Sequence, residues 1–342
     1  MKRIAVVILN WNGRKFLEEF LPNVIEYSID VADIYVADNG STDNSLEYLK
    51  LNFHQVKTIE LSENFGFAKG YNLALKQIDA EYYILLNSDV QVSENWIAPV
   101  IEFLDSNKDY VACQPKLLSF YHPDTFEYAG AAGGFIDKLG YPFCKGRIFN
   151  SIEKDLGQYN EFDEIFWATG ACLFVRAKEF HKLNGFDDDF FAHMEEIDLC
   201  WRFKNAGYKV GYCPNSSVLH VGGGSLPKSS SFKTYLNMRN NLTMVYKNHS
   251  SKHINWILFQ RLFFDLASSL KFLFDSGIKE FWTVPRAHYY FFKHFKEIKA
   301  KRKNTAHAHV SRVYNKSIVF RYFIRQRRYF SQLNSKDFTA SS

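Results

Sequence analysis

Residues 82–90 read YYILLNSDV, an apolar run that stops abruptly in a short polar turn. The run has the length and the composition of a buried strand. The turn carries a carboxylate, Asp89, beside Asn87 and Ser88. In an open α/β sheet, ligands bind just beyond the carboxyl ends of the strands, and a carboxylate there can bind a divalent cation and the anion that the cation carries. An Asp that only starts a turn is the alternative interpretation of this stretch on its own.

The segments around this strand alternate between strand and helix patterns, separated by loops rich in Asn, Asp, Ser and Gly. This βαβαβαβ order predicts an α/β fold with a doubly wound, mostly parallel sheet flanked by helices. The predicted strands are 4–9, 33–37, 56–61 and 82–86, and the predicted helices are 14–28, 45–52 and about 68–78. The pattern is irregular over 111–170, returns as a strand at 171–176, a helix at 195–206 and a strand at 209–213, and is helical from residue 231 onward.

The chain of 342 residues, 46% of them hydrophobic, is long enough for one large domain with an appendage or for two domains. Its five cysteines form no close pair and no zinc spacing, which is typical of reduced thiols in a cytosolic protein. Residues 1–9 are too short for a signal peptide and are better predicted as a first strand. No stretch of 18 uncharged apolar residues is present, so we expect no membrane-spanning helix.

The charge is divided along the chain. Residues 286–328 hold thirteen Lys or Arg and one acid, so this segment carries +12 and the rest of the chain −7 of the net +5. Large aromatic residues accompany the basic ones and also occupy 256–264. This combination is typical of an interfacial helix on an anionic membrane. A nucleic-acid-binding stripe and an ordinary charged surface over packed helices are the alternatives; we expect the membrane as partner, and no nucleic acid.

A polar or Gly-bearing loop follows each of the first four predicted strands, and the parallel order brings these loops to one edge of the sheet. Asp38, in the second loop, can accept a hydrogen bond from a ribose hydroxyl or a pyrimidine base. Gly66 and Gly70, in and after the third, let the backbone approach a ligand and begin a helix whose N-terminus favours phosphate. Asp89, in the fourth, would place a metal between two phosphates.

Together these stretches resemble the family 2 glycosyltransferases with a GT-A fold, in particular bacterial rhamnosyltransferase-like members that build surface polysaccharides. The resemblance runs from about residue 4 to about residue 245, and the order and number of blocks make it specific. The matching blocks are VVILNWNG at 6–13, VADNGSTD at 36–43, NFGFAKGYN at 64–72, LLNSD at 85–89, TGA at 169–171, GFDDDFF at 185–191, EEIDLCWR at 195–202 and VLHVGG at 218–223. We therefore expect a GT-A glycosyltransferase domain at 1–245 and a helical, basic, aromatic-rich region at 246–342.

By this resemblance, Asp38 reads the nucleotide base. Asp89 resembles the last carboxylate of a DxD metal motif, with Asn87 where the family often has Asp, so Asp89 is the principal acidic ligand. His220 resembles a metal-adjacent histidine, although an ordinary loop histidine is the alternative. Imidazole suits Mn²⁺ better than Mg²⁺, and the expected cofactor is Mg²⁺ or Mn²⁺. The residues expected to bind the nucleotide sugar are Asn10, Asn12, Asp38, Asn64, Gly66, Gly70 and Asn87.

Glu196 resembles the second acid of the family's paired-acid motif, where Asp is usual. In an inverting transfer the acceptor hydroxyl attacks the anomeric carbon and loses a proton, which a carboxylate with a raised pKa can accept. Asp198 and Arg202 are four residues apart and are expected to pair, so Glu196 is the better base. Glu195 and Trp167 are expected on the acceptor side, although the helix dipole alone explains Glu195 and aromatics like Trp167 are ordinary core.

The sequence therefore predicts a metal-dependent, inverting glycosyltransferase of cell-surface polysaccharide synthesis at the inner face of the cytoplasmic membrane. It would transfer a sugar, with rhamnose as the first candidate, from a dTDP- or UDP-sugar to a saccharide or lipid-linked saccharide. An NAD-dependent oxidoreductase is the rival enzyme, but the G-x-G-x-x-G motif is missing after the first strand. A non-catalytic sugar-binding protein is the rival from another class, and it would not need Asp89 and Glu196 together.

Overall fold

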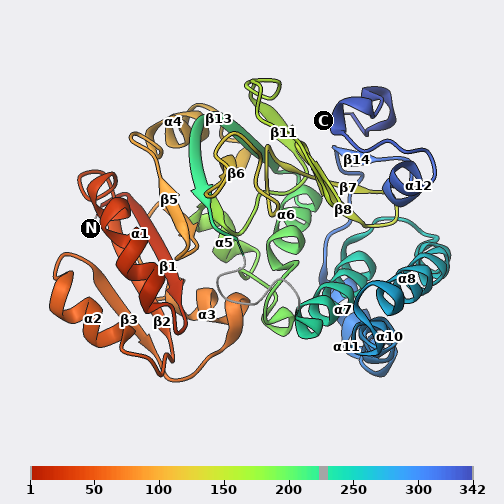
Figure 1. Cartoon of the computed structure of the whole chain (residues 1–342), viewed down its shortest axis with the longest axis horizontal. Helices are drawn as coiled ribbons and strands as arrows, with labels where there is room; N and C mark the ends of the chain where they lie inside the picture. Colours follow the sequence, from red (N-terminus) through yellow and green to blue (C-terminus); the bar gives the residue numbers. More distant parts are fainter. Residues whose placement is uncertain (1, 223–229, 341–342) are drawn as a thin grey trace.

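The computed structural model describes residues 2–222 and 230–340. Its centre is a large sheet in the order β11-β13-β6-β12-β4-β1-β2-β3, with β5 paired to β13. The C-terminal helices gather at the end of the molecule opposite α1 and α2 (Figure 1). The strands of this sheet are β1 (Ile4–Asn10), β2 (Asp33–Asn39), β3 (Lys57–Leu61), β4 (Tyr82–Leu86), β5 (Val90–Val92), β6 (Tyr110–Ser119), β11 (Asp163–Ile165), β12 (Cys172–Arg176) and β13 (Lys209–His220).

The parallel half of the sheet forms as predicted. β1 pairs in parallel with β2 and β4, and β2 pairs in parallel with β3. The helices between these strands are α1 (Arg14–Glu26), α2 (Ser45–Asn52) and α3 (Gly66–Leu75), each within three residues of its predicted bounds. The polar loops after these strands therefore meet at one edge of the sheet.

Successive side chains of β1 enter two different cores, because side chains alternate between the faces of a strand. Val6 and Ile8 pack with apolar residues of α1 and of α4 (Ala98–Ser106), while Ala5 and Val7 pack with apolar residues of α3. The sheet is thus covered on both faces, which explains why the strand sequences are apolar without alternation.

The other half of the sheet is mixed, because the irregular segment 111–170 returns the chain to the sheet in the opposite direction. β12 lies between β4 and β6 and runs antiparallel to both, with Cys172 opposite Leu86. The backbone N–H of Asn87 donates to the carbonyl of Ala171 at 3.0 Å. The start of β12 therefore lies at the tip of β4.

β13 is longer than the predicted strand 209–213. An irregularity between Cys213 and Ser217 lets it continue to His220, which pairs with Val90 of β5. This extension brings His220 next to the turn that carries Asp89.

A second, smaller sheet organises the irregular segment, in the order β10-β9-β8-β7-β14. Its last strand comes from the C-terminal region and pairs in parallel with β7, so the end of the chain is joined to the middle of the chain. The strands are β7 (Gly134–Asp137), β8 (Pro142–Cys144), β9 (Arg147–Ile148), β10 (Ser151–Ile152) and β14 (Val313–Tyr314).

Helices dominate from residue 231, as predicted. The expected boundary at residue 245 falls inside the first of them, α7. None of the helices in the described residues is both long and apolar enough to cross a membrane. The helices of this region are α7 (Ser231–Asn248), α8 (Ile254–Ser276), α9 (Ile278–Phe281), α10 (Thr283–Lys293), α11 (Phe295–Asn304) and α12 (Ile318–Phe323); α5 (Ala177–Lys182) and α6 (Glu195–Asn205) precede them.

Candidate active site

Asn10 and Asp38 are paired at the ends of β1 and β2. Both side chains are buried, and Asn10 Nδ2 donates to Asp38 Oδ1 at 2.9 Å, while Asp38 Oδ2 accepts from the backbone N–H of Ser41 at 2.9 Å. Asn10 Oδ1 is buried without a hydrogen-bond partner in the part of the chain that the structure describes. Such an acceptor costs about 1–3 kcal/mol unless water or a ligand satisfies it, so it is available to a ligand N–H or O–H.

Two other predicted residues tie the loops to each other. Asn12 has a left-handed backbone with φ 51°, and its Oδ1 accepts from the backbone N–H of Thr42 at 2.7 Å. Asn64 Oδ1 accepts from Asn39 Nδ2 at 3.0 Å and from the backbone N–H of Gly66 at 2.9 Å. Both side chains therefore shape the edge of the sheet.

The N-terminus of α3 is occupied by the protein itself rather than open to a phosphate. The backbone N–H groups of Phe67 and Ala68 donate to the carbonyl of Phe191. Gly66 has φ +77°, and a Cβ there would lie 2.6 Å from this carbonyl oxygen, so the contact requires glycine. Gly70 is buried in α3 and faces Leu9 and Asn39. The group that approaches Gly66 within the protein is therefore Phe191, whereas Gly70 is approached by side chains.

Asp89 and His220 meet at the tip of β4 and the end of β13. His220 Nε2 lies 3.2 Å from Asp89 Oδ1 and 3.4 Å from Asn87 Nδ2. Both Asp89 and His220 are buried. The structure thus brings together the three residues that the sequence places around the metal.

Glu127 lies on the other side of the imidazole, and no sequence motif pointed to it. Glu127 Oε1 is 3.4 Å from His220 Nδ1. Burial lowers the pKa of His220, but Asp89 and Glu127 outweigh it and raise the pKa to about 10. A carboxylate at Nδ1 favours the orientation in which Nε2 faces Asp89.

The donor set fits a divalent cation that shares its coordination with a ligand. Among residues 2–222 and 230–340, no three His, Cys, Asp or Glu side chains form a complete metal site. Asp89 supplies a carboxylate oxygen, and His220 supplies an imidazole nitrogen once the cation has displaced its proton; these two donors suit Mn²⁺. Such a cation would take its remaining ligands from water and the oxygens of a bound anion.

Glu195 and Glu196 begin α6, directly after the left-handed residues His193 and Met194. Glu195 is buried and Glu196 is partly exposed. Burial raises the pKa of Glu196 to about 7, and burial together with the neighbouring Glu196 raises the pKa of Glu195 well above its ordinary value. One carboxylate oxygen, Oε2, of each acid is buried without a hydrogen-bond partner among the described residues. A partly exposed carboxylate that titrates near neutrality has the properties of a general base.

A short path of contacts joins this acid pair to the tip of β4. Asn87 bonds to Ala171 through the backbone. A Cβ built on the preceding residue, Gly170, would lie 3.8 Å from the Cβ of Glu196. Glu196 therefore lies near the edge of the sheet where β4 ends and β12 begins.

Trp167 is placed differently from the prediction. Its side chain is 3% exposed, it packs against Gly134, and its indole N–H donates to the carbonyl of Phe135 at 2.9 Å. The ring has no free face for a sugar because the second sheet covers it.

Comparisons with known proteins identify a family for this chain. The sequence model of the family described as "Glycosyl transferase family 2" matches residues 5–182. The N-acetylglucosaminyl-diphospho-decaprenol L-rhamnosyltransferase of Mycobacterium tuberculosis is 26% identical over 235 residues, which cover 64% of this chain and 75% of the relative. The rhamnosyltransferase WbbL of Escherichia coli is 25% identical over 163 residues, 46% of this chain and 61% of the relative.

Among solved structures, GalNAc-T7 with UDP, GalNAc and Mn²⁺ has a TM-score of 0.60 at 17% identity. The match covers 86% of this chain and 58% of that chain, so it spans little more than half of the GalNAc-T7 structure. At this identity the likeness concerns the fold, and it confirms the predicted GT-A class.

Proposed function

The chain belongs to glycosyl transferase family 2, and we propose that it is a metal-dependent, inverting transferase that moves a hexose from a nucleotide-diphosphate donor to a saccharide or lipid-linked saccharide in cell-surface polysaccharide synthesis. The observation that carries the proposal is the position of Glu196 beside Gly170, which is linked through Ala171 to the turn of Asp89. A donor diphosphate at Asp89 would then have its sugar next to a carboxylate that can accept a proton.

Glu196 is the proposed general base. It takes the proton from the acceptor hydroxyl while that oxygen forms a bond to the anomeric carbon and the bond to the diphosphate oxygen breaks. With a pKa of about 7 it is about half ionised at pH 7 and largely ionised at slightly alkaline pH, yet it is basic enough to accept the proton.

Asp89 and His220 would hold the Mn²⁺ or Mg²⁺, with Asn87 beside them. When bound, such a cation neutralises the charge that develops on the departing diphosphate. Asp38 and Asn10 are the proposed contacts of the nucleotide base. Asn12, Asn64, Gly66 and Gly70 are proposed to shape the donor loops around them.

We do not extend the predicted acceptor role to Trp167 or Glu195, whose side chains are 3% and 4% exposed. Rhamnose is the proposed sugar because both relatives described above are named rhamnosyltransferases. The proposed donors are dTDP-rhamnose first and UDP-hexoses second.

We keep 1–245 as the transferase unit and propose that the C-terminal helices rest on the cytoplasmic membrane. α8 exposes a stripe of large apolar side chains at helical spacing, and α9 and α10 extend it. Exposed basic residues lie on or next to these helices in the sequence: Lys252, Lys279, Arg286, Lys293 and Lys296. The stripe consists of Trp256, Phe259, Phe263, Leu266, Leu270 and Phe274, and its extension of Ile278, Trp282, Tyr289 and Phe292.

Aromatic and basic residues on one face suit an anionic bilayer surface. Part of the basic segment predicted for this role is used inside the protein instead, because Lys301 pairs with Asp187 and Arg312 with Asp163. We therefore propose the apolar face of α8, rather than the middle of the basic segment, as the membrane contact.

Sedimentation with vesicles tests this surface. The wild type and Tyr121→Ser, which changes an exposed aromatic residue outside the C-terminal helices, should sediment with anionic vesicles at low salt. The variant Phe263→Ser/Phe274→Ser should stay in the supernatant. Two results would overturn the membrane assignment. In the first, the wild type does not sediment with the vesicles; in the second, the wild type is a dimer that these two substitutions dissociate.

A donor screen tests the function. Thermal shift with dTDP-rhamnose, UDP-hexoses and GDP-mannose, each with Mn²⁺ or Mg²⁺, should give a metal-dependent rise in the melting temperature for one donor. Release of the matching nucleoside diphosphate on adding the acceptor then shows transfer. Stabilisation by NAD alone would favour the oxidoreductase, and sugar binding without any nucleotide release would favour the non-catalytic protein.

A further inference from the structure

The segment just before Glu195 and Glu196 has an unfavourable backbone conformation. Phe191, His193 and Met194 have φ values of 62°, 70° and 72°, in the left-handed region that side chains other than glycine disfavour. Residues 187–194, here called the acid loop, need contacts from elsewhere to keep this conformation. Because α6 begins at Glu195, the shape of the acid loop sets the position of Glu196.

Helix α7 binds the backbone of the acid loop. Asn240 is 1% exposed, and its Nδ2 lies within hydrogen-bonding distance of three carbonyl oxygens, at 2.8 Å from Phe190, 2.9 Å from Ala192 and 2.7 Å from His193. Arg239 Nη2 donates to the Phe190 carbonyl at 2.9 Å. His193 is one of the three residues with a left-handed backbone, and Phe190 and Ala192 flank another, Phe191.

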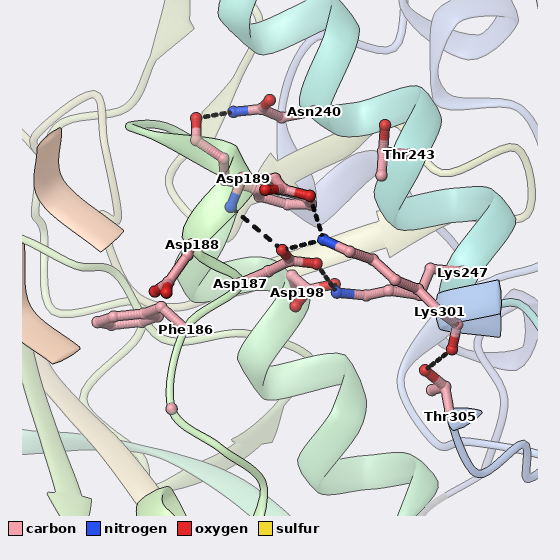
Figure 2. Close-up of polar contacts among 12 residues, drawn as sticks. Phe186, Asp187, Asp188, Asp189, Asp198, Asn240, Thr243, Lys247, Lys301 and Thr305 are labelled. Atoms are coloured by element: carbon pink, nitrogen blue, oxygen red, sulfur yellow. Dashed lines mark hydrogen bonds and ion pairs between the residues drawn. The ribbon is translucent and has the colours of Figure 1, made fainter. Parts of the chain in front are cut away.

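Two lysines from different helices hold the carboxylate at the start of the acid loop. Lys247, in α7, donates to Asp187 Oδ2 at 2.7 Å and also contacts Asp198 Oδ1 at 2.7 Å. Lys301, in α11, donates to the other oxygen of Asp187 and to Asp189 Oδ2 at 2.7 Å. Figure 2 shows both lysine side chains pointing at Asp187. Burial would raise the pKa of Asp187, but the two lysines outweigh it and hold that pKa below its ordinary value.

The acid loop is also fixed on its other side, by the donor loops. The Phe191 carbonyl accepts from the N–H groups of Phe67 and Ala68 at the start of α3. The acid loop therefore lies between α3, which belongs to the donor side, and the helices α7 and α11. Movement of the loop would change the distance between a bound donor and Glu196.

We propose that Asn240 and Lys301 are positioning residues, through which the C-terminal helices set the place of the catalytic base. This inference rests on the proposed role of Glu196. Lys301 is the better residue to change, since its side chain is 30% exposed and Lys247 stays on Asp187 when Lys301 is removed. The charge of Lys301 acts on the acid loop from 114 residues away in the sequence.

The test compares Lys301→Met with Lys299→Met, an exposed lysine on the same helix. Hydrogen exchange of the peptide spanning residues 187–197 needs no substrate, and Lys301→Met should raise its rate about tenfold while Lys299→Met leaves it unchanged. At saturating donor, kcat of Lys301→Met should fall about tenfold with the donor KM unchanged. Lys301→Arg should restore most of the kcat, because it restores the charge.

These measurements test the positioning role of Lys301 separately from the proposed transferase function. Wild-type exchange in Lys301→Met, or raised exchange with wild-type kcat, overturns the positioning role. Asp189→Asn removes only the ion pair between Lys301 and Asp189, whose side chain is 63% exposed. It should therefore change the exchange rate and kcat in the same direction as Lys301→Met, but less. If the wild type transfers no sugar, the proposed function fails, while the exchange experiment still reports whether Lys301 holds the acid loop.

Discussion

Glu196 lies directly against Gly170: a Cβ built on Gly170 would be 3.8 Å from the Cβ of Glu196 and 3.3 Å from Cζ of Phe67. The next residue, Ala171, accepts the backbone N–H of Asn87. Gly170 therefore stands between the proposed base and the tip of β4. Because Gly170 has no side chain, Glu196 can approach the tip of β4.

A side chain at Gly170 should move Glu196 away from the tip of β4, and a larger side chain should move it further. Gly170→Ala needs a shift of a few tenths of an ångström from the Phe67 ring, and we expect a mild loss of kcat. Gly170→Val reaches further toward Glu196, and we expect kcat to fall at least about tenfold with little change in donor affinity. Steady-state kinetics and donor titration measure both. A valine variant with wild-type kcat would show that this contact is unimportant for transfer.

Glu196→Gln should abolish transfer while the protein still binds the donor. The amide keeps the shape of the side chain but cannot accept the proton, so we expect kcat to fall by about 10²–10⁴-fold. Glu195→Gln is the matched control, because burial and the neighbouring Glu196 raise the pKa of Glu195 and so favour its uncharged form, which an amide resembles. Comparable losses in both variants would contradict the assignment of Glu196 as the base.

The rate should rise with pH up to about pH 7. Burial raises the pKa of Glu196 to about 7, and only the ionised carboxylate can accept a proton, so kcat should increase about tenfold per pH unit below this value and level off above it. Because the folded-state pKa lies above the unfolded value, the stability that this group contributes at low pH is lost as the pH rises through 7. The residual rate of Glu196→Gln should lack this limb of the profile. The same limb in that variant would assign the ionisation to another group.

The parallel half of the fold is predictable because the signals are local. The strands β1, β2 and β4 are apolar runs buried on both faces, and each stops at a polar turn that begins a loop of the site. The positions of Asp38 and Asp89 at one edge follow from strand order alone. The helix that begins at Glu195 was predictable from the helical pattern of residues 195–206.

The rest depends on contacts between distant segments. Nothing around Lys301 in the sequence distinguishes it from the other lysines of its helix, yet it binds Asp187, 114 residues away. The N-terminus of α3 looked open to phosphate, because the sequence does not reveal that the Phe191 carbonyl occupies it. Trp167 lies in an aromatic stretch, which suggested that its ring could stack on a sugar. In the structure the ring belongs to the hydrophobic core instead.

Glu127 should control metal affinity through His220. Its carboxylate lies 3.4 Å from His220 Nδ1, so Glu127→Gln removes the charge that orients the ring with Nε2 toward Asp89. Loss of such an outer carboxylate weakens metal binding by about 10–100-fold. Titration of the protein with Mn²⁺, followed by the electron paramagnetic resonance signal of the free ion, measures this without any substrate. Glu102→Gln, on the exposed side of α4, is the control and should bind Mn²⁺ like the wild type. Equal Mn²⁺ affinity in the two variants would mean that the position of His220 is set by β5 and β13 alone.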